Sequence, residues 1–145
     1  MTVQEQQEIK LEAYKEAMRY IANAKDVLSK AGFENGRYKD SKYVRMACGT
    51  AYSGTLIAIE TWLKLKDVDF SSVVKNRNKR KNIDFYKNNV AKRDGKLKDY
   101  LDDAYQILHL DGYYDGILNA TVIKEGFSAA KNIVEQIKPT KTEAL

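Results

Sequence analysis

Apolar residues recur at three- and four-residue steps along most of this chain, which is the spacing that places them on one face of an α-helix. The first such stripe contains Leu11, Tyr14, Met18, Ile21, Ala24 and Leu28, with charged residues between its members. The one proline among the 145 residues, Pro139, comes after the last stripe. The pattern predicts an all-α chain, folded as an antiparallel, up-and-down bundle of four helices.

Cap and turn residues set the boundaries of the first two helices. The first is predicted from Val3 to Ala31, because Gly32 follows where a left-handed cap residue sits and FENGRYKD then has turn composition. The second begins at a cap formed by Asp40 or Ser41 and continues through Leu65, until KDVDFSS ends it.

The third helix is predicted from about Asn82 to Leu110, bent or broken where Asp94 and Gly95 interrupt its stripe. LDGYYDG is predicted to form a turn, after which Asn119 or Thr121 caps the fourth helix. That helix ends before Pro139, so residues 1–145 are predicted to form one domain that is ordered from about residue 3 to residue 138.

The second helix has an uncharged middle, Met46 to Ile59, which is typical of a helix enclosed by its neighbours. The same run is too short and too rich in Gly, Ser and Thr to cross a bilayer, which needs roughly 20 apolar residues. The chain starts with a polar segment and has a single cysteine, Cys48, so we expect a cytoplasmic protein without a membrane span.

One histidine and one cysteine are too few for a transition-metal site, and we predict no metal and no cofactor. Four residues could line a pocket: Glu60, His109, Tyr113 and Tyr114. Glu60 is either a buried acid or the partner of Lys64 one turn later. His109 is either a helix-end residue interacting with terminal carbonyls or a catalytic group.

The strongest charge asymmetry lies between Lys75 and Lys98, where ten basic residues face two acidic ones, a net charge of +8. The remainder of the chain carries about −3, given a total of +5. Cations with nearby rings are what nucleic-acid binding needs, and a site for an acidic protein or a solvated helix face are the alternatives. The candidate contacts are Arg77, Lys79, Arg80, Lys81, Phe85 and Tyr86.

Three segments carry a family resemblance. AYSGTLIAIETWL resembles the second helix of HEPN domains, which are small bacterial and archaeal bundles of four or five helices. EAMRYIANAKDVLSKAG is similar to their first helix, and a YYDG turn before KEGFSAAKNIVEQI is similar to their last helix. The whole chain also resembles a family of small helical proteins from Bacteroidetes, which implies no function.

The HEPN resemblance implies the bundle fold and dimerisation. Many HEPN domains are ribonucleases or toxins, often paired with a nucleotidyltransferase-like antitoxin, and their signature is an Arg followed four to six residues later by His. Here that spacing before His109 holds Asp103, Ala104 and Tyr105. We therefore expect a non-enzymatic binding module that forms a homodimer; the alternative is an RNA-acting nuclease or toxin–antitoxin component.

Overall fold

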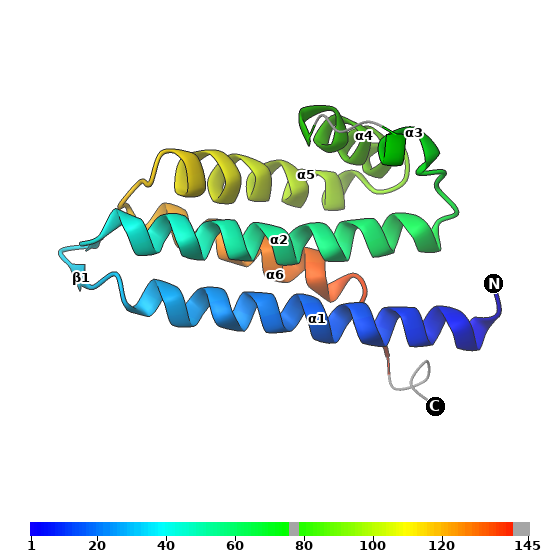
Figure 1. Ribbon diagram of the computed structural model, residues 1–145, viewed down its shortest axis with the longest axis horizontal. Helices are drawn as coiled ribbons and strands as arrows, with labels where there is room; N and C mark the ends of the chain where they lie inside the picture. Colours follow the sequence, from blue (N-terminus) through cyan, green and yellow to red (C-terminus); the bar gives the residue numbers. More distant parts are fainter. Residues whose placement is uncertain (76–78, 141–145) are drawn as a thin grey trace.

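The computed structural model describes residues 1–75 and 79–140, and the side chains of residues 74, 75 and 79–81 lie outside that description. Its two longest helices, α1 (Val3–Ser29) and α2 (Ser41–Leu65), lie side by side and run antiparallel (Figure 1). Asp40 caps α2 by accepting a hydrogen bond of 3.0 Å from the amide of Lys42. The predicted bounds of the second helix are confirmed, and α1 ends two residues before the predicted Ala31.

A two-stranded hairpin, β1 (Phe33–Glu34) and β2 (Arg37–Tyr38), joins these helices, where the sequence indicated only a turn. Asn35 and Gly36 have φ values of 53° and 77°, and tight hairpin turns favour Asn-Gly because both central residues need positive φ. The Tyr38 amide donates to the Leu118 carbonyl at 2.8 Å. The hairpin therefore fixes the chain that enters the last helix.

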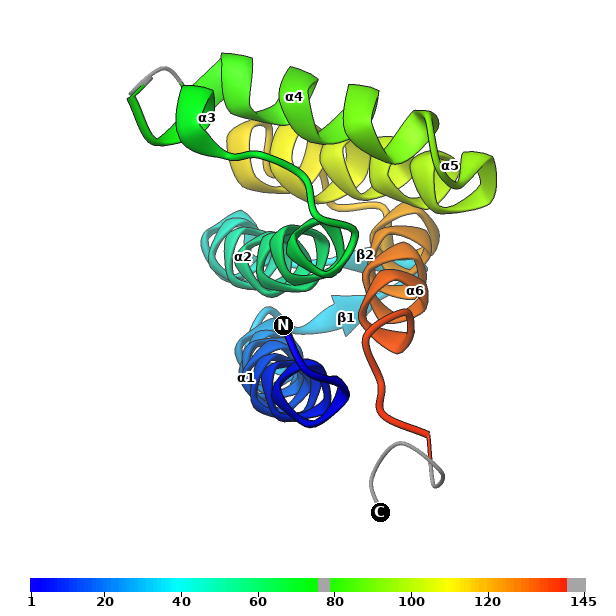
Figure 2. The ribbon, with the colours of Figure 1, turned by 90° about the vertical axis from the view of Figure 1, so that its right-hand side faces the viewer.

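The predicted third helix is divided into separate helices. A short α3 (Ser71–Lys75), which the sequence did not indicate, precedes α4 (Lys79–Ala91), and the chain turns before α5 (Gly95–Ala104). Asp94 caps α5 by accepting a hydrogen bond of 3.0 Å from the Leu97 amide, which explains the break beside Gly95. Figure 2 shows α4 on the outer side of α5, away from α1.

The turn predicted at LDGYYDG is confined to its last residues, because the chain passes from α5 directly into a π-helix, η1 (Tyr105–Tyr114), and turns only at Asp115. Gly112 brings the backbone of η1 against α2; a Cβ at this position would lie 2.6 Å from the Cβ of Cys48. Packing against α2 thus overrides the local turn preference of the two Asp-Gly pairs. The last helix, α6 (Ala120–Glu135), is capped by Asn119 as predicted and ends before Pro139.

Helix α2 contacts α1, α4, α6 and η1, so it occupies the centre of the fold. Gly54 permits its close contact with α1, since a Cβ there would lie 3.1 Å from the carbonyl oxygen of Ala17. One face of α2 nevertheless stays open: Ser53 is exposed and Met46 is 52% exposed. The expectation that neighbours enclose the middle of this helix is therefore only partly correct.

The all-α prediction is confirmed apart from the small hairpin. The predicted count of four helices is not confirmed, because the described residues form six α-helices and the π-helix η1. Among these elements, none has both the length and the apolar composition of a membrane-spanning helix.

Candidate functional site

Three rings of η1 form a stack that includes His109. Its imidazole lies 5.3 Å from the ring of Tyr105 and 6.0 Å from that of Tyr113, with an angle of 28° between planes in both pairs. A π-helix closes i to i+5 hydrogen bonds, so residues four or five positions apart share one side of it. This period explains why Tyr105, His109 and Tyr113, at four-residue intervals, lie in one row.

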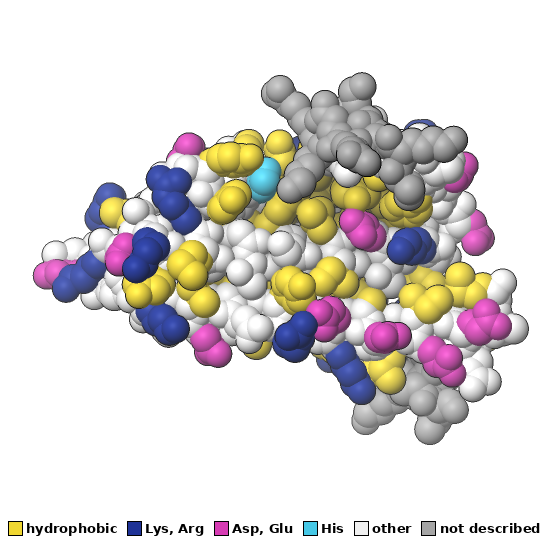
Figure 3. All heavy atoms as spheres, viewed as in Figure 1, with side chains coloured by type: hydrophobic (Ala, Val, Ile, Leu, Met, Phe, Trp, Pro, Cys, Tyr) yellow, Lys and Arg dark blue, Asp and Glu magenta, His cyan; other side chains and the backbone are white. Residues whose placement is uncertain are grey.

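Tyr52 of α2 and Tyr114 of η1 complete the cluster. The Tyr52 ring stacks on His109 at 4.7 Å, and the Tyr114 ring meets it edge-on at 5.0 Å. We call the five side chains the tyrosine patch: Tyr52, Tyr105, His109, Tyr113 and Tyr114. Figure 3 shows the histidine on the molecular surface, bordered by hydrophobic side chains.

The patch has a buried floor and an exposed rim. Tyr52 is 8% exposed, and burial, followed by the neighbouring Tyr105, raises the pKa of its hydroxyl. Tyr113 and Tyr114 are 46% and 59% exposed. Exposed aromatic rings held against a rigid floor are a feature of surfaces that recognise a partner or ligand.

Residues of α2 hold the rim in place. A Cβ at Gly49 would lie 3.2 Å from Cδ2 of Tyr113, so the glycine lets this ring approach the backbone of α2. One turn earlier, the Arg45 guanidinium donates hydrogen bonds to the carbonyl oxygens of Tyr113, Tyr114 and Asp115. Arg45 was not among the residues that the sequence singled out.

Cations border the patch on the side of α4. Nζ of Lys87 lies 4.4 Å from the centroid of the Tyr105 ring, a cation–π contact. The same nitrogen is 3.3 Å from Asp102, which Lys98 also contacts at 2.5 Å. The hydrogen bond and the charge of Asp102 raise the pKa of Lys98. Two lysines therefore surround the carboxylate of Asp102 at this edge of the patch.

The structure brings three of the four predicted pocket residues together and places the fourth elsewhere. His109, Tyr113 and Tyr114 belong to the patch, whereas Glu60 lies two turns beyond Tyr52, about 12 Å along the axis of α2. Glu60 accepts a hydrogen bond of 2.7 Å from the hydroxyl of Tyr86. Burial and this hydrogen bond raise the pKa of Tyr86.

Of the six predicted nucleic-acid contacts, the structure describes only the side chains of the two aromatic residues. Tyr86 is 5% exposed, and the half-buried ring of Phe85 packs 5.5 Å from that of Phe70, so both rings support the interior. The side chains of Arg77, Lys79, Arg80 and Lys81 lie outside the described part of the chain. Their binding role stays a prediction.

The four-residue spacing of Tyr105, His109 and Tyr113 was the signal that could have revealed the patch.

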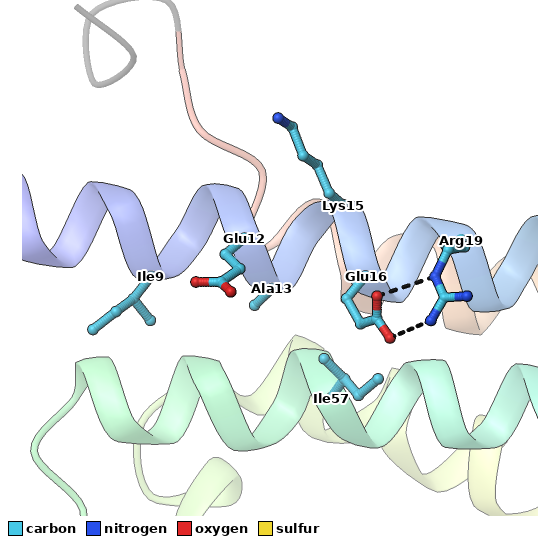
Figure 4. A pocket seen from close by; sticks show the side chains of 7 residues that line it. All are labelled: Ile9, Glu12, Ala13, Lys15, Glu16, Arg19 and Ile57. Carbon is cyan, nitrogen blue, oxygen red and sulfur yellow. Dashed lines mark hydrogen bonds and ion pairs between the residues drawn. The ribbon is translucent and has the colours of Figure 1, made fainter.

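A shallow groove with a charged rim lies between α1 and α2 (Figure 4). Arg19 donates to both carboxylate oxygens of Glu16, at 3.1 and 2.6 Å, and this bond lowers the pKa of Glu16. The groove is lined by Ile9, Glu12, Ala13, Lys15, Glu16, Arg19 and Ile57. Because Glu16 and Arg19 already satisfy each other, the tyrosine patch is the better candidate site.

Within the described residues, no cluster of three or more His, Cys, Asp or Glu side chains is suited to hold a metal ion. The thiol of Cys48 is buried, and desolvation raises its pKa to about 12. Cys48 therefore fills space beneath η1 in the protonated form, and we assign it no nucleophilic role.

Iodoacetamide at about pH 8 is accordingly expected to alkylate Cys48 only as fast as the protein unfolds, because the unfolded thiol has a pKa of about 8.5. Intact-protein mass spectrometry measures the rate, with the protein in guanidinium chloride as the fully reactive control. Rapid labelling of the native protein, with the far-UV spectrum unchanged, would contradict the buried position of Cys48.

Comparison with known proteins places the chain in a family. Residues 12–139 match the model of the family described as Domain of unknown function (DUF5618). The chain belongs to the DUF5618 family. A solved structure described as a protein of unknown function from Dyadobacter fermentans is 40% identical to it, with a TM-score of 0.73, and the match covers 88% of this DUF5618 chain and 94% of that chain. No curated protein matches.

Dyadobacter is a member of the Bacteroidetes, so the predicted resemblance to small helical proteins of that group is supported. The likeness of this DUF5618 domain to HEPN domains stays a resemblance.

Proposed function

We propose that this DUF5618 domain is a non-enzymatic binding module that holds single-stranded nucleic acid on its tyrosine patch. The observation that carries the proposal is the pair of exposed rings, Tyr113 and Tyr114, fixed beside His109 and bordered by the basic helix α4. Proteins that bind single strands combine aromatic rings, on which bases stack, with cations that follow the phosphates.

Charge supports a polyanionic ligand. The segment between Lys75 and Lys98 carries +8, and it runs through α4, whose Lys87 touches the patch. Lys92, Arg93 and Lys96 of the same segment are exposed in the turn after α4 and at the start of α5. Cations that neutralise phosphates release counterions, so we expect the affinity to fall steeply with salt.

The residues before His109 support binding without cleavage. The HEPN signature needs an arginine four to six residues earlier, and Asp103, Ala104 and Tyr105 occupy those positions. His109 itself is packed among the rings of the patch, where it extends the stack. The imidazole lies at the molecular surface, but the chain does not supply the arginine of that signature as its partner in acid–base chemistry.

The decisive variant replaces both rim tyrosines by alanine. Tyr113→Ala with Tyr114→Ala is expected to weaken binding of a labelled RNA of about 12 nucleotides by roughly tenfold or more, since stacking contributes ~1–3 kcal/mol per base. Fluorescence anisotropy at about 50 mM salt measures the affinity. Phe33→Ala is the matched control, because it removes a 58% exposed ring from the hairpin, outside the patch.

Weaker binding by the double tyrosine variant, with unchanged binding by Phe33→Ala, supports the proposal. Equal affinities of the wild type and the double tyrosine variant would contradict it. RNA shortened by the wild type but left intact by His109→Ala would favour the nuclease alternative. If the wild type fails to bind at low salt, an acidic protein becomes the better candidate ligand of the basic segment.

The expected homodimer stays a proposal, which sedimentation equilibrium tests.

A further inference from the structure

The π-helix η1 needs an explanation, because helices of this kind occur mostly as single-turn bulges, frequently at functional sites. Ten consecutive residues in this conformation are unusual. Tyr105, His109 and Tyr113 all lie along one side of η1. Whatever holds η1 in this register therefore also sets the geometry of the tyrosine patch.

The hydrogen bonds at the end of η1 identify the stabilising group. The amides of Asp115, Gly116 and Ile117 donate to the carbonyls of Leu110, Gly112 and Asp111. The next three carbonyls along the chain belong to Tyr113, Tyr114 and Asp115, and all three accept from the Arg45 guanidinium. Arg45 thus satisfies the carbonyls that a helix end leaves without partners.

A planar guanidinium suits this arrangement, because its two terminal nitrogens donate to the three carbonyls together. It presents five N–H donors in a rigid fork, whereas a lysine ammonium is a point charge on a flexible stem. Gly116 has a φ of 62°, and a Cβ there would lie 2.6 Å from Nε of Arg45. A glycine at the turn therefore leaves room for the guanidinium.

We propose that Arg45 is the positioning residue of the tyrosine patch: its guanidinium holds the last turn of η1 in the π-register and so fixes the rings of Tyr113 and Tyr114. Only the expected effect of Arg45 on RNA binding rests on the proposed function. Arg45, Cys48 and Gly49 lie on one face of α2, and all three contact the end of η1. The patch is thus built by α2 as well as by η1.

The test replaces Arg45 by lysine, which keeps the charge and removes the fork. Hydrogen exchange of the amides of residues 115–117 is expected to accelerate about tenfold, because loss of charge-assisted bonds opens this segment more often. Amides in the middle of α2 should keep their wild-type rates. The NMR signals of the Tyr113 and Tyr114 rings should shift in the folded protein. Arg19→Lys, on α1, is the matched control and should change none of these.

Gly116→Ala adds a Cβ 2.6 Å from Nε of Arg45 and also strains a backbone with a φ of 62°, so it disturbs the same contact from the other side and should reproduce the exchange and ring changes. If both variants fold and keep wild-type exchange at residues 115–117 and wild-type ring signals, the inference is wrong. Changed rates with unchanged ring signals would also overturn it, because Arg45 would then stabilise η1 without positioning the patch. RNA affinity, measured in parallel, tests the proposed function separately. If the wild-type protein does not bind RNA, the proposed function is wrong, and the hydrogen-exchange result still decides the role of Arg45.

Discussion

Replacing Gly54 with leucine is expected to destabilise the protein by about 3 kcal/mol, the upper part of the usual range for overpacking. A Cβ at this position would already lie 3.0 Å from Cβ of Tyr20 and 3.1 Å from the carbonyl oxygen of Ala17. The further atoms of leucine have to displace α1 from α2, since a backbone carbonyl cannot move aside as a side chain can. Urea unfolding followed by far-UV circular dichroism measures the change.

Ser53→Leu is the matched control for this variant. Ser53 precedes Gly54 on α2 but is exposed, so the same side chain is added without a clash. Its free energy of unfolding should stay within about 0.5 kcal/mol of the wild-type value. If Gly54→Leu changes it by less than about 1 kcal/mol, α2 is not packed as closely against α1 as the structure has it.

Reversing the four cations Arg77, Lys79, Arg80 and Lys81 to glutamate is expected to abolish binding of the single-stranded RNA. The net charge between Lys75 and Lys98 falls from +8 to zero, which removes counterion release at this segment. We expect a loss of more than about a hundredfold at about 50 mM salt. Three of the substitutions fall in the first turn of α4, where glutamate is favourable to the helix, so the fold should persist.

A control of equal charge separates a local effect from a change in net charge. Lys15, Lys25, Lys30 and Lys131 are exposed on α1, at its end and on α6, and their reversal to glutamate lowers the total charge equally. This control should bind several-fold more weakly at most. Similar losses in both variants would mean that the basic segment has no specific role and that only the overall charge matters.

Local chemistry made several features readable from the sequence. Asp40 and Asn119 were each one of two candidate caps, because a short polar side chain accepts from an amide two or three residues away. The break beside Gly95 was predicted from the interrupted stripe, and Asp94 accounts for it by capping the following helix. Such interactions lie within one helical turn.

The tyrosine patch was only partly predictable. His109, Tyr113 and Tyr114 were candidates, but Glu60 was grouped with them although it bonds to Tyr86. The rings of Phe85 and Tyr86 were expected to stack on bases, whereas they support the interior around Phe70. A helical stripe reveals that a residue faces a neighbour, and it does not reveal which neighbour.

By itself, the sequence determined the all-helical character of this protein, the bounds of α2 and the concentration of positive charge between Lys75 and Lys98, because composition, periodicity and capping act along the chain. Only the tertiary structure decided the π-register of η1 and the assembly of the patch. The contact of Arg45 with Tyr113 spans 68 residues, and Tyr52 reaches His109 from another helix. Contacts at that separation form only when the helices pack, so no local pattern encodes them.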